Sequence, residues 1–351
     1  MAHDAASVRP RAGPRPGTQG RKPAPSRDRE RRAYAALDLG TNNCRLLIAR
    51  PAGDGFTIID AFSRIVRLGE GLAASGRLSD AAITRAIAAL SICADKLKRR
   101  NVTLVRSVAT EACRRAENGA EFVARVHAET GIRLDVIDPG EEARLAVLGC
   151  QALLPDGEGP ALIFDIGGGS TELVLVDTEH GTPRIVDWFS APWGVVSLTE
   201  AEGDGREGAD AAECLDTYRR MRARVAAAFA DFAATLPRPA VPPRLLGTSG
   251  TVTTLASLHL GLPAYDRRAV DGLIVPAESM RAISARLSGL TIADRARVPC
   301  IGSERADLVV AGCAILEAIL DLWPAASLGV ADRGIREGIL RSLIARDGAY
   351  A

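Results

Sequence analysis

The amino-acid sequence predicts an α/β protein built from two domains of one design. Short apolar segments of strand-like composition alternate with segments whose apolar residues recur at helical spacing. One pattern, an apolar strand ending on Asp, then a glycine turn and a second strand, occurs at Asp38 and again at Asp165. The chain has 351 residues, which is enough for two domains that each bury a core.

The first repeat opens the N-terminal domain, which we place at residues 33–139. Its expected strands are residues 34–39, 44–49, 56–62, 102–108 and 134–137. A helix is expected to begin near residues 78–80, because Ile83, Ile87 and Leu90 then fall on one helical face. Residues 117–129 form a second expected helix, and a third opens after the turn at 138–140.

The second repeat opens the other domain, placed at residues 140–331. Its strands are expected at 161–166 and 172–176, around a glycine turn at 167–170. A third strand–glycine–helix joint covers 244–251 and leads into a helix at 252–258. Residues 201–212 have the composition of a polar loop, and helices are expected at 306–320 and 335–343.

Composition excludes several classes of function. Basic and acidic residues nearly balance, 44 against 43, so there is no broad basic face for a specific nucleic-acid partner. Nine lysines and arginines lie in residues 1–32, a Pro- and Gly-rich segment that we expect to be a disordered, solvated tail; weak tethering of RNA or polyphosphate is the alternative. The longest apolar run near the C-terminus is too short to span a membrane.

Cysteine and histidine usage narrows the chemistry further. The seven cysteines are scattered without a C-x-x-C pair, which is typical of a reduced, cytoplasmic protein. The four histidines show no metal-binding spacing. The sequence therefore favours neither a structural zinc site nor a Ser/His/Asp hydrolase.

Three glycine turns are candidate phosphate-binding sites. Backbone amides exposed in such turns, with small hydroxyl side chains beside them, provide donors for phosphate oxygens. A single turn is weak evidence, because glycine also serves ordinary hairpins. Neither a Walker A motif nor a dinucleotide-binding glycine motif is present. The candidate residues are Gly40, Thr41, Asn42, Gly167, Gly168, Gly169, Ser170, Thr171, Ser249, Gly250 and Thr251.

Carboxylates next to these turns are candidate metal ligands. Asp38 and Asp165 each end a buried strand, where a carboxylate is costly unless it has a partner. Glu172 follows on the return strand of the second hairpin. Oxygen ligands of this kind suit a hydrated Mg²⁺ ion held against phosphate. The alternative is that both aspartates simply cap their turns.

Two further positions remain open from composition alone. Asp138 and Glu141 have the spacing of a capping box at a helix start, so Glu141 and its neighbour Glu142 favour a structural interpretation. Arg114, with Arg115, could clamp phosphate, or it could lie in a solvated loop.

At these residues the sequence resembles the exopolyphosphatase/guanosine pentaphosphate phosphohydrolase (Ppx/GppA) family of the acetate and sugar kinase/Hsp70/actin superfamily. The resemblance runs from about residue 35 to 343. It is carried by ALDLGTNN (36–43), VATEACR (108–114), GEEARL (140–145), FDIGGGSTE (164–172), GTSGT (247–251) and GIREG (334–338).

The resemblance implies two RNase H-like domains facing an interdomain cleft, with the last helix, placed at 332–347, returning to the first domain. It implies that Glu142 is the base for the attacking water, that Asp38, Asp165 and Glu172 help to hold Mg²⁺, and that the glycine turns and Arg114 bind terminal phosphates. Family members release the terminal phosphate of inorganic polyphosphate or the 5′-γ-phosphate of guanosine pentaphosphate. The resemblance also allows a homodimer.

Two alternatives follow. Exopolyphosphatase and guanosine pentaphosphate phosphohydrolase share every motif named here, so the sequence does not separate them. An actin- or Hsp70-like ATP-binding module is the alternative of another class, although no adenosine-binding segment is evident. Longer family members carry extra helical domains that bind long polyphosphate. Because processivity on long chains is associated with those domains, it is not part of the prediction for this sequence.

Overall fold

The computed structural model describes residues 32–53, 55–154, 157–179, 183–203, 210–236 and 242–348. Apart from Arg32, the basic tail expected at 1–32 lies outside these ranges. None of the helices in the described ranges is long and apolar enough to cross a membrane.

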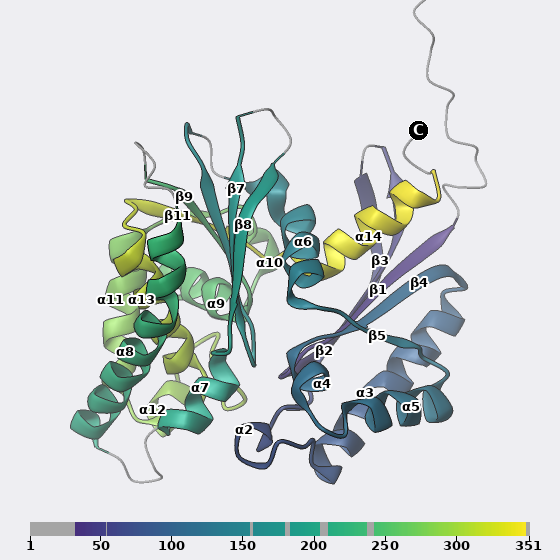
Figure 1. The fold of residues 1–351 in the computed structure, drawn as a ribbon, viewed down its shortest axis with the longest axis horizontal. Helices are drawn as coiled ribbons and strands as arrows, with labels where there is room; N and C mark the ends of the chain where they lie inside the picture. The colour runs from purple at the N-terminus through teal and green to yellow at the C-terminus, as the bar shows by residue number, and fades with distance from the viewer. Residues whose placement is uncertain are drawn as a thin grey trace, which may run out of the picture.

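The described residues form two sheets of related topology (Figure 1). In the first, with order β3-β2-β1-β4-β5, the neighbours β3, β2 and β1 are antiparallel, whereas β4 and β5 run parallel to β1. In the second, with order β10-β11-β9-β6-β7-β8, the hairpin strands β6, β7 and β8 are antiparallel, and β9 and β11 run parallel to β6. The repeat in the sequence is therefore a repeat of topology, and it confirms the α/β fold class.

The strand bounds are close to those expected around the repeated motif. The first sheet contains β1 (Ala33–Leu39), β2 (Asn43–Ala52), β3 (Gly55–Ile65), β4 (Val102–Ala109) and β5 (Leu134–Val136). The second contains β6 (Ala161–Ile166), β7 (Thr171–Asp177), β8 (Arg184–Ala191), β9 (Arg244–Thr248), β10 (Ile274–Pro276) and β11 (Ser327–Ala331).

Helices cover both faces of the first sheet. Leu37 of β1 packs in one core with residues of α3 (Asp80–Arg99) and α5 (Gly119–Thr130), whereas its neighbour Ala36 packs in another with Ile339 of α14 (Ile335–Arg346). Alternating residues of one strand thus serve two cores. Figure 1 shows the C-terminal helix α14 lying on this first sheet, beside α6 (Pro139–Cys150).

The second sheet is packed against a larger helical layer. Its central member is α13 (Val309–Leu322), which is buried along nearly its whole length between α8 (Ala211–Thr235) and α11 (Ala277–Ser288). This helix confirms the apolar helix expected at 306–320. The other helices and turns are α2 (Leu72–Ser75), α4 (Glu111–Arg115), η1 (Gln151–Leu153), α7 (Val195–Glu202), α9 (Gly250–His259), α10 (Arg267–Val270) and α12 (Ile292–Ala296).

The polar loop expected at 201–212 is only partly right. Residues 201–202 complete α7, and residues 211–212 begin α8, whose N-cap Asp210 accepts hydrogen bonds from the backbone amides of Ala212 and Glu213. Residues 204–209 of that loop lie outside the described ranges. Acidic and small residues are common both in loops and at helix N-termini, where they act as caps. Composition alone therefore suggested a loop at residues that belong to the ends of two helices.

Candidate active site

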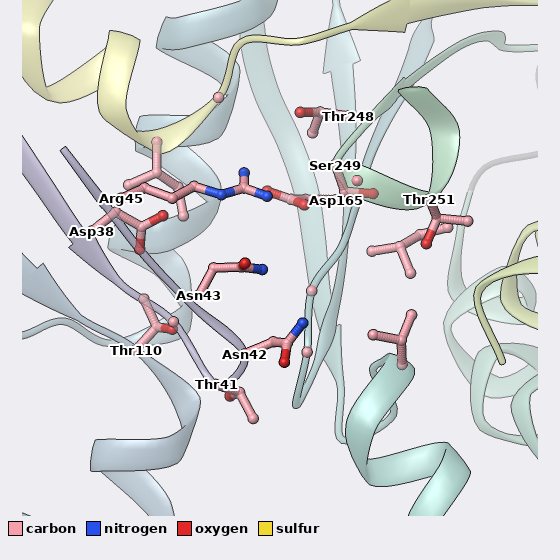
Figure 2. Close-up of a pocket in the computed structure, with 18 of the residues that line it drawn as sticks. Asp38, Thr41, Asn42, Asn43, Arg45, Thr110, Asp165, Thr248, Ser249 and Thr251 are labelled. Carbon is pink, nitrogen blue, oxygen red and sulfur yellow. The ribbon is translucent and has the colours of Figure 1, made fainter. Parts of the chain in front are cut away.

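One cavity lies between the two sheets, and all three predicted glycine turns border it (Figure 2). It is lined by the β1–β2 turn, the β6–β7 turn, the β9–α9 joint, the β11–α14 joint and the first turn of α6. The predicted residues that line it are Asp38, Gly40, Thr41, Asn42, Glu142, Asp165, Gly167, Gly168, Gly169, Ser170, Glu172, Ser249, Gly250 and Thr251.

The two hairpin turns touch one another. A Cβ atom on Gly168 would lie 3.0 Å from both the backbone nitrogen of Asn42 and the Cβ of Thr41, and one on Gly169 would lie 2.7 Å from Thr41 Oγ1. None of Gly167, Gly168 and Gly169 has a positive φ. Gly168 and Gly169 are therefore needed for the close approach of the two hairpins and not for a left-handed backbone.

Two carboxylates face each other within the second hairpin. Asp165 and Glu172 are direct partners in the β6–β7 register, so their side chains lie on the same face of the sheet. Burial raises the pKa of Asp165 to about 6. Burial and the charge of Asp165 raise the pKa of Glu172 to about 7, although the hydroxyls of Ser170 and Ser190 donate to its Oε1 at 2.7 and 2.9 Å. A cation between the two carboxylates would relieve this repulsion.

The first hairpin presents a carboxylate beside a guanidinium. Asp38 and Arg45 are register partners on β1 and β2. Burial raises the pKa of Asp38, while the charge of Arg45 opposes the rise. Figure 2 shows Arg45 extending from this sheet toward Asp165 of the other sheet, and its charge also opposes the raised pKa of Asp165. The charge of Arg45 therefore lowers the pKa of Asp38 on the neighbouring strand and that of Asp165 on the other sheet.

Glu142 enters the cavity from the first turn of α6. Asp138 caps this helix by accepting a 2.9 Å hydrogen bond from the Glu141 amide. Only 6% of Glu142 is exposed, and Arg114 Nη1 donates to its Oε2 at 3.2 Å. Burial, followed by the charge of Glu172, raises the pKa of Glu142 well above its usual value, and Arg114 opposes this. A carboxylate with a raised pKa accepts a proton readily, as a general base must.

The neighbouring Glu141 has a different environment. Its carboxylate pairs with Arg106 and Arg144, each at 2.6 Å, and these interactions lower its pKa to about 2. Because both salt bridges use the Glu141 side chain, the reciprocal half of the expected capping box is not made. The structural interpretation of the two glutamates therefore fits Glu141, whereas Glu142 lines the cavity.

Two predicted phosphate ligands do not line the cavity. Thr171 is completely buried, and its hydroxyl donates to the Trp193 carbonyl at 2.7 Å. Successive side chains of a strand point to opposite faces, so Glu172 faces the cavity and Thr171 cannot. Arg114 lies behind Glu142, where it also donates to Glu111 Oε2 at 2.8 Å and to the Ile137 carbonyl at 2.6 Å. Its contacts are those of a residue that positions Glu142.

Sequence reasoning missed several arginines that line the cavity. Within the described ranges, Arg45 and Arg336 make no salt bridge or side-chain hydrogen bond, and the guanidinium of Arg305 donates a hydrogen bond only to the Thr254 hydroxyl, at 3.3 Å. A Cβ on Gly250 would lie 3.6 Å from Arg305 Nη1 and 3.9 Å from Arg45 Nη2, so guanidiniums from both halves approach this one turn. Such unpaired cations suit a ligand with several negative charges.

Arg45 could have been found from alternation along its strand. Asn43 and Arg45 are partly exposed, whereas Cys44 and Leu46 are buried, which is the pattern of a strand with one face on the core. Arg333 also lines the cavity, but it pairs with Asp271 at 2.8 Å.

Two buried polar atoms at the cavity have no hydrogen-bond partner among the residues that the structure describes. They are Asn42 Oδ1 and Ser249 Oγ. Ser249 also has a φ of 106°, a backbone conformation that is strained for any residue with a side chain. Unpaired polar atoms and strained backbone are both costly, and they concentrate at functional sites.

The carboxylates fit a water-rich magnesium site better than a protein cage. Within the described residues no three His, Cys, Asp or Glu side chains converge closely enough to enclose a metal. Mg²⁺ usually keeps several waters and takes one or two carboxylates together with substrate phosphates. The repelling Asp165–Glu172 pair has the right chemistry for that kind of site.

Fold and site together define a class of protein. Two duplicated α/β halves close on a cavity that combines glycine turns, unpaired arginines and a buried glutamate with a raised pKa. These are the parts that phosphoryl transfer requires, namely positioning, counter-charge and an oriented nucleophile.

Comparison with known proteins identifies the family. The model of the Ppx/GppA phosphatase family matches residues 47–347, and the chain belongs to this family. It is 34% identical over 324 residues to exopolyphosphatase 2 of Mycobacterium tuberculosis, covering 88% of this chain and 98% of that protein. It is 29% identical to the guanosine-5′-triphosphate,3′-diphosphate pyrophosphatase of Aeromonas salmonicida, covering 89% of this chain and 59% of that protein.

A solved structure agrees with the fold. The crystal structure of an exopolyphosphatase-like protein superposes with a TM-score of 0.80 at 29% identity, covering 90% of this chain and 99% of that one. The fold class expected from the resemblance, two RNase H-like domains that face a cleft, is thus confirmed.

Proposed function

We propose that the protein is a phosphoanhydride hydrolase that releases orthophosphate from the end of inorganic polyphosphate. The observation that carries the proposal is the position of Glu142, a buried carboxylate with a raised pKa, in the same cavity as three glycine turns and unpaired arginines. The relative from Mycobacterium tuberculosis, which this chain matches over 98% of its length, is named exopolyphosphatase 2 and supports polyphosphate as the substrate.

Different residues of the cavity bind the terminal phosphate, balance its charge and activate the attacking water. Backbone amides at the turns of Gly40 and Gly168 bind the oxygens of the terminal phosphate, and Arg45 and Arg305 balance the charge of the chain. Glu142, held by Arg114, orients a water molecule and takes its proton as the oxygen attacks the terminal phosphorus. The bond from the terminal phosphorus to the bridging oxygen breaks, and the shortened chain leaves with that oxygen and its negative charge. Orthophosphate carries one oxygen from water, and the proton on Glu142 passes to solvent.

We also propose that Asp165 and Glu172 hold a Mg²⁺ ion, with Asp38 nearby on the first hairpin. The raised pKa values of Asp165 and Glu172 support a cation at this pair. Bound there, the ion would neutralise charge on the phosphates.

Guanosine pentaphosphate is the second candidate substrate. The similarity to the Aeromonas salmonicida protein favours it, and its 5′-triphosphate end presents the same chemistry as a short polyphosphate. An ATP-binding module, the alternative of another class, is disfavoured because the chain belongs to a phosphatase family. A cytoplasmic location and a homodimer remain predictions.

Orthophosphate release measured on four substrates tests the proposal. Tripolyphosphate, long polyphosphate, guanosine pentaphosphate and ATP are each incubated with the enzyme and MgCl₂. We expect release from tripolyphosphate or guanosine pentaphosphate with kcat/KM well above that for ATP. Turnover of ATP alone, or of nothing, contradicts the proposed function.

A further inference from the structure

A loop at residues 66–71, which we name the bridging loop, is built directly onto the first phosphate turn. The backbone amides of Val66 and Arg67 donate to the Asn42 carbonyl at 2.8 and 3.0 Å, and the Gly69 amide donates to the Thr41 carbonyl at 2.9 Å. A Cβ on Gly69 would collide with Thr41 Cγ2, so the loop fits this closely only with glycine there. The loop is therefore anchored to the turn by backbone hydrogen bonds and a close contact.

From this anchor the loop reaches the other half of the molecule. Arg67 donates through Nη1 to Asp307 Oδ2 at 2.7 Å and through Nη2 to Asp307 Oδ1 at 3.2 Å, which is a bidentate pair. Nη2 also donates to the Glu304 carbonyl at 3.2 Å. Arg67 holds this position with a φ of +46°, which is unusual for a residue with a side chain.

A second contact joins the bridging loop to α7. The Gly71 amide donates to Glu200 Oε1 at 2.7 Å. The start of α7 is in turn bonded to the second phosphate turn, because the amides of Val195 and Val196 donate to the carbonyls of Gly167 and Gly168 at 2.9 and 2.8 Å. The loop thus connects the two phosphate turns around the outside of the cavity.

The target of Arg67 is the segment that carries Arg305. Glu304 and Asp307 flank Arg305, whose guanidinium lines the cavity. Arg67 itself is not among the lining residues. The pair is also partly solvent-exposed, with 33% of the Arg67 side chain and 26% of the Asp307 side chain accessible, so it contributes little to stability. Its position suggests a role in the site.

We infer that Arg67 is a positioning residue that holds the Arg305 segment of the second half in register with the first phosphate turn. Arg305 and Arg45 approach the Gly250 turn from opposite halves, so a shift between the halves separates the two guanidiniums that a polyanion would bridge. The inference rests on the proposed function, because it assigns Arg67 an effect on binding of the same phosphate substrate.

Two measurements test the inference. The first is the kcat and KM for tripolyphosphate of Arg67→Ala and Asp307→Asn. Each variant should raise KM about tenfold, a size typical of coupled charge pairs, with kcat changed much less. The double variant should be no worse than Arg67→Ala, because Asp307→Asn weakens an interaction that Arg67→Ala has already removed. Arg222→Ala, which breaks the Arg222–Asp321 pair on the outer surface of the second half, serves as the matched control and should leave KM unchanged.

The second measurement is calorimetric binding of tripolyphosphate to the same substitutions in a Glu142→Gln background, which needs no turnover. If the wild type releases no orthophosphate, the proposed function fails, and the binding measurement still decides the role of Arg67. Weaker binding in both variants supports the inference. An unchanged KM together with an unchanged binding constant overturns the inference. A fall in the melting temperature alone, or in kcat alone, overturns it as well. If Arg67→Ala does not fold, Asp307→Asn gives the answer.

Discussion

Replacing Glu142 with glutamine separates the chemical role of this residue from its structural one. The amide has the shape of the carboxylate, and its oxygen can still accept the hydrogen bond from Arg114, which is 3.2 Å long in the wild type. The variant loses only the charge and the ability to take a proton. Its effect on turnover therefore measures the contribution of the general base.

The expected loss is about 10² to 10⁴ in kcat, the usual range for a lost general base. This corresponds to about 2.7–5.4 kcal/mol of transition-state stabilisation. Stability should change in the opposite direction. Burial and the charges of Glu172, Asp165 and Asp38 all disfavour the ionised form of Glu142, so the neutral amide removes a repulsion. At pH 8 the variant should melt at a higher temperature than the wild type.

The assay combines steady-state orthophosphate release with thermal unfolding at the same pH. Glu141→Gln is the matched control on the adjacent residue. That substitution weakens salt bridges to Arg106 and Arg144 and should lower the melting temperature while keeping most of the activity. If Glu142→Gln keeps wild-type turnover, or if Glu141→Gln loses as much, the assignment of the base is refuted.

Three other predictions follow from the site. Arg114→Ala removes the charge that lowers the pKa of Glu142, so the acidic limb of the kcat–pH profile should move to higher pH; an unmoved limb contradicts the positioning role. Gly168→Ala places a Cβ 3.0 Å from the Asn42 nitrogen and should cost about 1–3 kcal/mol in chemical unfolding, whereas Gly55→Ala, with its closest contact at 3.9 Å, should cost much less, and equal costs would refute the close-approach argument. The pKa of Glu172, raised from 4.5 to about 7, means that the folded state binds its proton more tightly than the unfolded state, so this contribution to stability is present below pH 4.5 and lost as the pH rises through 7. The melting temperature of Glu172→Gln should accordingly fall less than that of the metal-free wild type between pH 4.5 and 7, and parallel curves would show that the carboxylate is not buried in this way.

The repeated hairpin could be predicted because its sequence signals are local. An apolar strand, an Asp and glycines occur together at residues 36–43 and 163–172, and these determine two equivalent hairpins. The helix α8 was not predicted, since its alanines and arginines give a weak apolar stripe next to a polar segment. Strands β8 and β11 were missed for a related reason: β8 is largely exposed, and β11 is five residues long.

Site residues could be predicted where they belong to one continuous motif. They could not be predicted where the site depends on the packing of the two sheets against each other. The turn residues could be named from their motifs, and Glu142 only from the family resemblance that the GEEARL segment helps to carry. Arg305 could not, because its approach to Gly250, which Arg45 shares from the other sheet, depends on how the two sheets are packed. The side chain of Thr171 points away from the cavity, which the alternation of side chains along β7 could have indicated.

The most direct test of the central claim follows the oxygen of the attacking water. Tripolyphosphate is hydrolysed in H₂¹⁸O, and the products are analysed by mass spectrometry. Attack on the terminal phosphorus by a water bound at Glu142 places one ¹⁸O atom in each released orthophosphate and none in the pyrophosphate. Label found in the pyrophosphate instead would show that the terminal phosphorus is not the atom attacked, and the account of this cavity would be wrong.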